Sequence, residues 1–242
     1  MPTHLEYDQM MMKKYKTDDD QYFDYISKLD GLWDGPKDLI YNFNVFVGSV
    51  NLARFLAYYE MYKQVVDISG DIADVGTYRG ASLLTFAKFI KIFEPYSQTR
   101  AHGFDWFKGM DPGPDDAAAN EGKYVPSKQT LQRLVDLQGL DGFIELHDMD
   151  LTSPDLPAFL NERPWLRFKC IFLDCGMAKV MQSTLEHMYP RLVPGGILIL
   201  DHFNNAMSPQ ESSIVQSFTG DAVVRQIPYS RGPSAYIVKP GA

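Results

Sequence analysis

The stretch of sequence that decides the fold is Gly70-Asp-Ile-Ala-Asp-Val-Gly-Thr-Tyr-Arg-Gly80. Its apolar residues Ile72, Ala73 and Val75 predict a short buried strand, and residues 81–90 predict a helix, because their apolar side chains recur at helical spacing. Gly76 and Gly80 bracket the loop between them, where glycine permits turns that a Cβ would forbid and lets the backbone approach a ligand closely. Strand, glycine loop and helix form the first unit of a nucleotide-binding α/β sheet.

The spacing of this loop does not suit a dinucleotide. The dinucleotide pattern is G-x-G-x-x-G, which places a pyrophosphate on a helix N-terminus. Here the pattern is D-x-G-x-x-x-G and begins with Asp74, whose carboxylate would repel a pyrophosphate but suit an amine or a sulfonium. The pattern resembles motif I of the class I S-adenosylmethionine (SAM) methyltransferases. The alternative is a tight structural connection without a ligand.

Length and charge limit the classes of protein. A chain of 242 residues can form one large α/β domain with an appendage, and we expect an N-terminal helical arm or cap at 1–66 and a SAM-binding domain at 67–242. The net charge of −8 argues against a broad nucleic-acid contact surface. We expect a small-molecule acceptor, no membrane partner and a homo-oligomer. Residues 10–12, three methionines, are either an amphipathic contact or part of a surface arm.

The cysteines and the chain start indicate a compartment. Cys170 and Cys175 flank an apparent buried strand and cannot form a disulfide framework, which fits a reducing environment. No apolar run is long enough to span a membrane, and residues 1–7 lack a basic-then-apolar signal pattern. We therefore expect a cytoplasmic protein.

The next two strands carry candidate cofactor ligands. Residues 101–105 predict a second strand that ends in Asp105, where an acid can accept hydrogen bonds from ribose hydroxyls; the alternative is an acid that caps a loop. Residues 143–147 alternate as a third strand. Asp148 and Met149 follow it, where adenine contacts or ordinary loop contacts would fall.

The intervening segments predict a lid and helices. Residues 106–126 are rich in Gly, Pro and Asp, as in lids and binding loops. Ser127 can cap the helix that follows, and 51–66 predicts an earlier helix whose apolar stripe packs on the sheet or covers the cofactor. That stripe comprises Leu52, Phe55, Leu56, Tyr59, Met61, Tyr62 and Val66.

The last part of the chain completes an alternating sheet. Residues 168–174 predict a fourth strand that ends in an acid, and Pro194-Gly-Gly196 predicts a turn before a fifth strand. Ser208-Pro-Gln-Glu211 reads as a capping box at a helix start, and 223–238 as a closing hairpin. We predict an α/β fold with a Rossmann-like, mostly parallel sheet and one closing antiparallel strand.

Several segments together resemble the macrocin O-methyltransferase (TylF-like) family of sugar methyltransferases over roughly residues 45–238. The matching segments are the glycine loop, Asn51-Leu-Ala-Arg-Phe55, Gly103-Phe-Asp-Trp-Phe-Lys-Gly109, Leu173-Asp174, Thr184-Leu-Glu-His-Met-Tyr-Pro-Arg-Leu192 and Pro194-Gly-Gly-Ile-Leu-Ile-Leu-Asp201. The resemblance implies SAM as cofactor and a sugar or glycosylated metabolite as acceptor, in natural-product or glycan biosynthesis. The cofactor-binding residues that we expect are Asp74, Gly76, Thr77, Tyr78, Arg79, Gly80, Ser82, Asp105, Trp106, Asp148, Met149 and Asp174.

The resemblance also implies a divalent cation on Asp174 and Asp201, at the ends of strands four and five. Hard oxygen ligands suit Mg²⁺. This chain has His202 where the family has a second Asp, and Cys175-Gly176 where it has Gly-Asp, so a softer ion or no metal becomes an alternative. His202 is then a metal ligand or a general base, with Asp174 beside it; His147 is a weaker catalytic candidate.

The sequence thus predicts a SAM-dependent O-methyltransferase that acts on a small polar acceptor. A catechol-type or other small-molecule O- or N-methyltransferase is the alternative among enzymes, and the loop spacing disfavours a nicotinamide-dependent dehydrogenase. A non-catalytic assembly partner with the SAM fold is the alternative of a different class, favoured by the missing carboxylates and opposed by the intact Asp74, Gly76, Gly80 and Asp105.

Overall fold

The computed structural model describes residues 16–29, 31–114, 116, 118–205 and 208–241. Its centre is a seven-stranded sheet of order β3-β2-β1-β4-β5-β7-β6, in which β7 runs antiparallel to both of its neighbours and the other strands pair in parallel. The strands are β1 (Asp71–Val75), β2 (Ala101–Asp105), β3 (Ile144–Asp148), β4 (Phe168–Leu173), β5 (Leu192–Leu200), β6 (Val224–Gln226) and β7 (Ala235–Val238). The predicted Rossmann-like, mostly parallel sheet with a closing antiparallel strand is confirmed.

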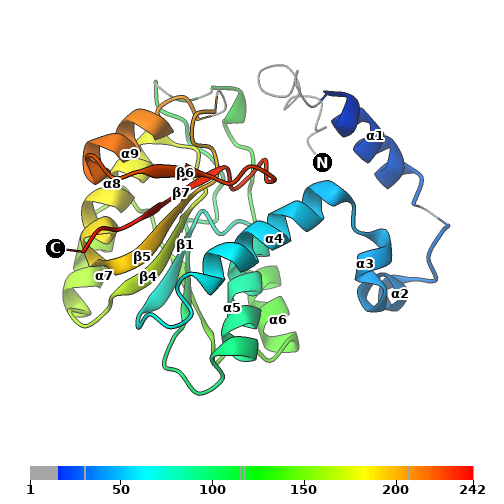
Figure 1. Ribbon diagram of the computed structural model, residues 1–242, viewed down its shortest axis with the longest axis horizontal. Helices are drawn as coiled ribbons and strands as arrows, with labels where there is room; N and C mark the ends of the chain where they lie inside the picture. The colour runs from blue at the N-terminus through cyan, green and yellow to red at the C-terminus, as the bar shows by residue number, and fades with distance from the viewer. Residues whose placement is uncertain (1–15, 30, 115, 117, 206–207, 242) are drawn as a thin grey trace.

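Helices cover both faces of this sheet (Figure 1). One face is covered by α4 (Ser49–Lys63), α5 (Ala81–Phe93) and α6 (Lys128–Leu137), and the other by α7 (Asp155–Glu162), α8 (Ala178–Met188) and α9 (Glu211–Thr219). Short 3₁₀ turns lie at η2 (Ala118–Asn120) and η3 (Tyr189–Arg191). No helix of the described residues is both long and apolar enough to cross a membrane.

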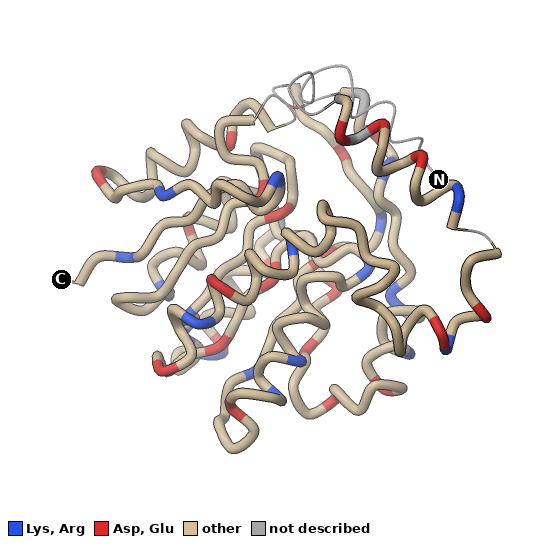
Figure 2. The backbone as a smooth tube through the Cα atoms, turned by 45° about the vertical axis from the view of Figure 1, so that its right-hand side comes forward, with Lys and Arg blue, Asp and Glu red and all other residues tan. Residues whose placement is uncertain are grey.

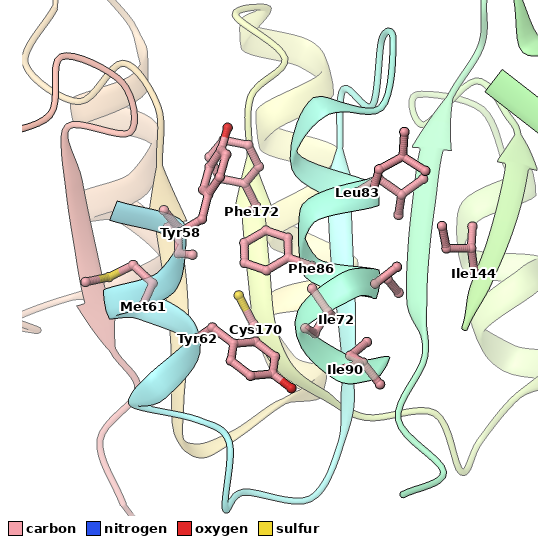
Figure 3. Packing of buried hydrophobic residues seen from close by; sticks show 14 of the residues in the cluster. Tyr58, Met61, Tyr62, Ile72, Leu83, Phe86, Ile90, Ile144, Cys170 and Phe172 are labelled. Atoms are coloured by element: carbon pink, nitrogen blue, oxygen red, sulfur yellow. The ribbon is translucent and has the colours of Figure 1, made fainter. Parts of the chain in front are cut away.

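Both faces of the central strands are buried, so their side chains alternate between two apolar clusters. In β5, Ile197 and Ile199 enter the cluster under α4 and α5, whereas Leu198 and Leu200 enter the cluster under α8. Such strands read as continuous apolar runs, which is why they could be predicted without alternation. Figure 3 shows Tyr58 and Tyr62 of α4 beside Phe86 of α5 and the strand residues beneath them.

The N-terminal helices stand apart from the sheet. Figure 1 shows α1 (Lys16–Ser27), α2 (Pro36–Tyr41) and α3 (Phe43–Phe46) to one side, with α4 leading back to the sheet. Acidic residues cluster on α1, whereas both signs of charge are mixed over the rest (Figure 2). The three methionines 10–12 lie outside the described residues. The division of the chain at 66/67 stays a prediction.

The predicted helix at 51–66 is α4, but its buried face differs from the predicted stripe. Leu52, Phe55 and Leu56 are exposed, and the buried residues on this helix are Ala57, Tyr58, Met61 and Tyr62. The apolar side chains in the first half of α4 therefore lie outside the packed core, whereas those of its second half pack against the sheet.

Two local predictions were wrong. Pro194-Gly-Gly196 does not form a turn before β5; it lies within that strand, where the pairing with β4 shifts register between Phe168 and Cys170. A side chain at Gly196 would lie 2.9 Å from the carbonyl oxygen of Lys169, so the bulge needs glycine there. Helix α9 begins at Glu211 rather than after Ser208, and no side chain caps it. Helix α7 was not predicted.

Other local predictions are confirmed. Ser127 caps α6, because its Oγ accepts a hydrogen bond of 3.1 Å from the backbone N–H of Thr130. The closing hairpin is the antiparallel pair of β6 and β7.

Candidate active site

A cavity of about 630 Å³ opens at the carboxyl ends of the parallel strands. This is the edge where open α/β sheets bind ligands. Residues from the glycine loop, from the ends of β2, β4 and β5, and from α4 meet in its wall. Its lining comprises Arg54, Gly76, Tyr78, Phe104, Asp105, Trp106, Gly109, Met110, Asp111, Pro112, Gly113, Pro114, Asp116, Asn120, Tyr124, Met149, Asp150, Leu151, Thr152, Asp174, Cys175, Gly176, Met177, Lys179, Val180, Asp201 and His202.

The glycine loop packs directly against the end of β4. Gly76 has φ +83°, and a Cβ there would lie 2.0 Å from the backbone oxygen of Asp174. Only glycine can therefore bring the loop this close to β4. The result is a wall in which Gly76, Tyr78 and Asp174 all face the cavity.

Asp74 is buried beneath this loop and does not line the cavity. Neither of its carboxylate oxygens has a hydrogen-bond partner among the described residues. Burial raises the pKa of Asp74 to about 7, and the nearby hydroxyls of Ser82 and Thr77 oppose this only in part, because neither makes a well-aligned bond to the carboxylate. An unpaired buried carboxylate next to the loop is suited to compensate a positively charged group bound above it.

Asp105 does line the cavity, at the end of β2. Its carboxylate accepts hydrogen bonds from the backbone N–H of Tyr78, at 2.8 Å, and of Phe107, at 2.7 Å. These bonds tie the glycine loop to the end of β2 and fix the carboxylate. Each oxygen keeps further acceptor capacity for a hydroxyl group.

The other predicted cofactor residues divide into two groups. Trp106 and Met149 line the cavity, as does Asp174. The residues that do not line it are Thr77, Arg79, Gly80, Ser82 and Asp148. Thr77 is buried and donates its hydroxyl to the backbone oxygen of Asp74, and Asp148 pairs with Lys128 at 3.2 Å on the surface. These two contacts hold the loop and the end of β3.

The structure brings Asp174, Asp201 and His202 together. One potential ligand atom from each lies within 4.8 Å of the other two. Oδ1 of Asp174 is 3.8 Å from Nδ1 of His202, and Oδ2 of Asp201 is 3.4 Å from Nε2 of the same ring. We call this trio the strand-end cluster. Its members meet because β4 and β5 are neighbours and both acids directly follow the last paired residue.

Arg54 of α4 is a site residue to which the sequence analysis gave no role. Its Nη2 lies 3.0 Å from Oδ2 of Asp174, and its Nη1 lies 3.1 Å from Oδ1 of Asp201. Nη1 also donates to the carbonyl of Gly232 at 3.0 Å, and Nε donates to the hydroxyl of Tyr58 at 2.5 Å. The signal in the sequence was a lone arginine within the apolar part of a predicted helix.

Arg54 supplies the positive charge that two neighbouring carboxylates require. Burial lowers its pKa, but the charges of Asp201 and Asp174 outweigh that effect and raise it, so the guanidinium stays ionised. Burial and the charge of Asp201 together raise the pKa of Asp174 to about 6. The carboxylates of Asp174 and Asp201 therefore share the positive charge of Arg54 on the side of the site that faces α4.

The opposite side of the strand-end cluster is suited to a metal ion. Nδ1 of His202 is buried and has no hydrogen-bond partner among the described residues, and Oδ1 of Asp174 faces it. Two carboxylate oxygens and an imidazole nitrogen are a donor set for a divalent cation of the first transition row, or for Mg²⁺ completed by water. The residues present therefore fit such an ion with Arg54 in place.

Glu211 is a residue near the site whose role the sequence analysis assigned wrongly. It is buried, and its Oε1 accepts the backbone N–H of His202 at 3.2 Å instead of capping α9. Burial lowers the pKa of His202, but the charges of Asp201, Asp174 and Glu211 together outweigh that effect and raise it. Burial also raises the pKa of Glu211 to about 7.

His147 lies away from this site. It does not line the cavity; its ring stacks on Phe104 and meets the ring of Phe159 edge-on, with centroids 4.6 Å from each. Burial and the nearby ring of His102 lower the pKa of His147 to about 3. The geometry gives no support to the predicted catalytic role of His147.

The loop at 106–126 forms one wall of the cavity. Asp116 fastens it: one carboxylate oxygen accepts the backbone N–H of Gly113 and the other accepts the N–H of Ala178, the first residue of α8, each at 2.8 Å. Met110 and Gly122 are also bonded across the loop, as Met110 accepts the N–H of Gly122 at 2.9 Å. The mobility of the loop stays a prediction.

Comparisons with known proteins agree with this geometry. The family described as "Methyltransferase domain" (Methyltransf_24) matches residues 73–203, more than half of the chain. No curated protein matches the chain significantly.

Similar solved structures include CalS11, a calicheamicin methyltransferase, which is 24% identical over 88% of this chain and 89% of that chain, with a TM-score of 0.79. The apo structure of CalS11, described as a TDP-rhamnose 3′-O-methyltransferase, is 25% identical over 84% and 86% of the two chains, with a TM-score of 0.71. The O-methyltransferase NovP is 16% identical over 78% and 80%, with a TM-score of 0.63. A glycine loop after β1, an acid at the end of β2 and a family match over the whole parallel sheet lead to one conclusion: the chain belongs to this methyltransferase-domain family and is a class I SAM-dependent methyltransferase.

Proposed function

We propose that the protein transfers the methyl group of SAM to a hydroxyl of a sugar or a glycosylated metabolite. The observation that carries this proposal is that one cavity is lined both by the cofactor loop and by the strand-end cluster. Gly76, Tyr78 and Asp105 line it together with Asp201 and His202. A cofactor on the loop would therefore present its reactive end to groups that can hold and deprotonate an alcohol.

The glycine loop and the end of β2 are the proposed cofactor site. Asp105 would accept the ribose hydroxyls, Met149 would contact the adenine, and the buried charge of Asp74 would favour the positively charged end of the cofactor. SAM supplies a methyl group already activated by its sulfonium. The chain must therefore orient the acceptor oxygen, remove its proton and exclude water.

The strand-end cluster is the proposed acceptor-activating group. Asp174, Asp201 and His202 would hold a divalent cation, which lowers the pKa of a hydroxyl that it binds. Arg54 keeps the two carboxylates in place from the other side. If chelation leaves activity intact, His202 takes the role of general base, for which an imidazole near neutral pH is suited.

The sugar acceptor rests on two kinds of similarity. The segments of the sequence listed above resemble the macrocin O-methyltransferase family, and the structure of a TDP-rhamnose 3′-O-methyltransferase is 25% identical to this chain. The polar groups of the cavity, among them Asp111, Asn120 and Thr152, suit an acceptor with several hydroxyls. A catechol would instead use the aromatic and methionine side chains of the same cavity.

The proposal is tested by incubating the protein with SAM and either TDP-rhamnose or a catechol, and measuring the S-adenosylhomocysteine released. We expect release with the sugar nucleotide, little with catechol, and loss of release in H202Q with cofactor affinity retained. Release with catechol alone would favour the catechol-type alternative. A protein that binds neither SAM nor S-adenosylhomocysteine would support the non-catalytic alternative.

Further expectations accompany this function. A small-molecule acceptor, the absence of a nucleic-acid partner, a homo-oligomeric state and a cytoplasmic location stay predictions. The mixed surface charge of the sheet domain and the net charge of −8 support a small-molecule rather than a nucleic-acid partner.

A further inference from the structure

A second group of potential metal ligands lies on the edge of the sheet, on β2 and β3. Nδ1 of His102 is 3.0 Å from Nε2 of His147 and 3.1 Å from Oε2 of Glu145. Nε2 of His147 is 3.9 Å from the same oxygen of Glu145. We call these three residues the edge cluster. His102 and Glu145 are cross-strand partners in the β2–β3 ladder, so the sheet register itself brings them together.

Two further residues orient the edge cluster. Nε2 of His102 lies 3.1 Å from Oδ2 of Asp71, so the second ring nitrogen is held by a carboxylate and Nδ1 is left to face the cluster. The backbone N–H of Arg100 donates to Oδ1 of Asp71 at 2.8 Å, and its guanidinium lies 3.7 Å from Oε1 of Glu145. The carboxylates of Asp71 and Glu145 thus each turn one oxygen toward Arg100 and the other toward His102. A histidine that ligates a metal is commonly fixed in this way by a carboxylate on its other nitrogen.

The edge cluster is separate from the active site and open to solvent on one side. None of its members lines the active-site cavity. The exposed fraction of the side chain is 4% for His102, 13% for His147 and 41% for Glu145, so an ion can enter past Glu145. The strand β3 that carries two of the ligands is an edge strand, paired with β2 alone.

We propose that His102, Glu145 and His147 form a binding site for a first-row divalent transition-metal ion such as Zn²⁺. Ligand–zinc bonds of about 2.0–2.2 Å at tetrahedral angles place ligand atoms about 3.4 Å apart. The three separations in the edge cluster, from 3.0 to 3.9 Å, bracket that value. Two imidazoles disfavour Mg²⁺ and Ca²⁺, which prefer oxygen.

The bound ion would tie the edge strand to its neighbour. It would join one ligand of β2 to two of β3, in addition to the backbone ladder between them. Because the ion binds the folded chain, it raises the midpoint of thermal unfolding in proportion to its affinity. The role that follows from this placement is structural and independent of the methyl transfer.

The test is a zinc titration of the full-length protein after all bound metal has been removed by chelation. Zinc binding is measured by competition with a chromophoric chelator. H202Q serves as the background, because it removes the imidazole of the strand-end cluster. We expect H202Q to retain one equivalent of Zn²⁺ and to gain thermal stability with it. Co²⁺ in its place should give the visible absorption of a four-coordinate site with nitrogen ligands.

Variants then assign the ligands. Adding E145Q to H202Q should abolish the bound equivalent, and D71N should weaken it by about 10–100-fold, as for a carboxylate that orients a ligating histidine. H187Q, added to H202Q in the same way, is the matched histidine control outside both clusters, and this double variant should bind zinc as H202Q does. Glu145 is part-exposed, so E145Q is expected to fold; circular dichroism checks this.

Other outcomes overturn the proposal. If H202Q binds no zinc, or if folded E145Q/H202Q binds it unchanged, the edge cluster is not a metal site. A shared proton between His102 and Glu145, seen as a charged imidazole by NMR in zinc-saturating buffer, also overturns it.

Discussion

The guanidinium of Arg54 and the carboxylate of Asp201 form an ion pair, with Nη1 3.1 Å from Oδ1, although 147 positions separate them in the sequence. The same guanidinium reaches Asp174, so one side chain of α4 joins the ends of β4 and β5. The two acids on which the sequence analysis expected a divalent cation are thus bridged on one side by an arginine. A metal ion at His202 would add to that bridge rather than replace it.

Removal of this bridge should destabilise both the fold and the site. We expect R54Q to lower the free energy of unfolding by about 1.5–3 kcal/mol, the range for hydrogen bonds to charged groups, and to reduce methyl transfer. R54K should recover only part of both losses, because an ammonium cannot bridge two carboxylates as a planar guanidinium does. Urea denaturation and a kinetic assay measure the two effects. The exposed Arg133 of α6 gives the control variant, R133Q; an equal loss there would contradict the assignment.

Asp105 should contribute directly to cofactor affinity. We expect D105A to weaken S-adenosylhomocysteine binding by about 1.5–3 kcal/mol, because a charged acceptor of ribose hydroxyls is lost and the glycine loop is released. Isothermal titration calorimetry measures the change, with D141A, an exposed acid beyond α6, as the control. Unchanged affinity in a folded D105A variant would remove Asp105 from the cofactor site.

Asp74 should make stability depend on pH. Its pKa is raised to about 7 in the folded chain, against about 4 when unfolded, so the folded state binds the proton more tightly. The contribution of Asp74 to stability is therefore full below about pH 4, falls as the pH rises toward 7 and is lost above that. We expect D74N to be more stable than the natural chain by about 1–4 kcal/mol at pH 8, and by less at pH 5. Urea denaturation of both proteins at pH 5 and pH 8 checks this. The same difference in the free energy of unfolding at the two pH values would contradict the prediction.

Asp116 should hold the cavity loop against α8. In D116A, the backbone N–H groups of Gly113 and Ala178 lose the carboxylate to which they donate. We therefore expect faster hydrogen exchange at these two N–H groups and a raised KM for the methyl acceptor. E121A, at an exposed acid of the same loop that does not line the cavity, is the control. The loop at 106–126 should also become more protected when cofactor and acceptor bind together. Full protection of the loop in the free protein would argue against a lid.

Metal removal should lower activity through the strand-end cluster. We expect chelation to reduce methyl transfer and Mg²⁺ or Mn²⁺ to restore it, because the cation lowers the pKa of the acceptor hydroxyl. E145Q is the control, because it disrupts the edge cluster and leaves the strand-end cluster intact. Methyl transfer by E145Q should fall on chelation as much as methyl transfer by the natural chain. Full activity after chelation would assign His202 as a general base instead.

Local patterns in the sequence determined the sheet, the glycine loop and the acids at the strand ends. The central strands are buried on both faces, so they appear as apolar runs that need no tertiary context to be found. The acid after each run then falls at the carboxyl edge of the sheet. Asp105, Asp174 and Asp201 could be predicted as site residues for that reason.

Only the tertiary structure decided what these acids touch. Arg54 reaches Asp174 and Asp201 because the second half of α4 packs on the sheet, and His102 meets Glu145 because of the β2–β3 register. Glu211 reaches the backbone of His202 because α9 begins there, whereas its local pattern predicted a helix cap. Most of these contacts join residues far apart in the chain, and the geometry of all of them depends on packing and register, which no local pattern encodes.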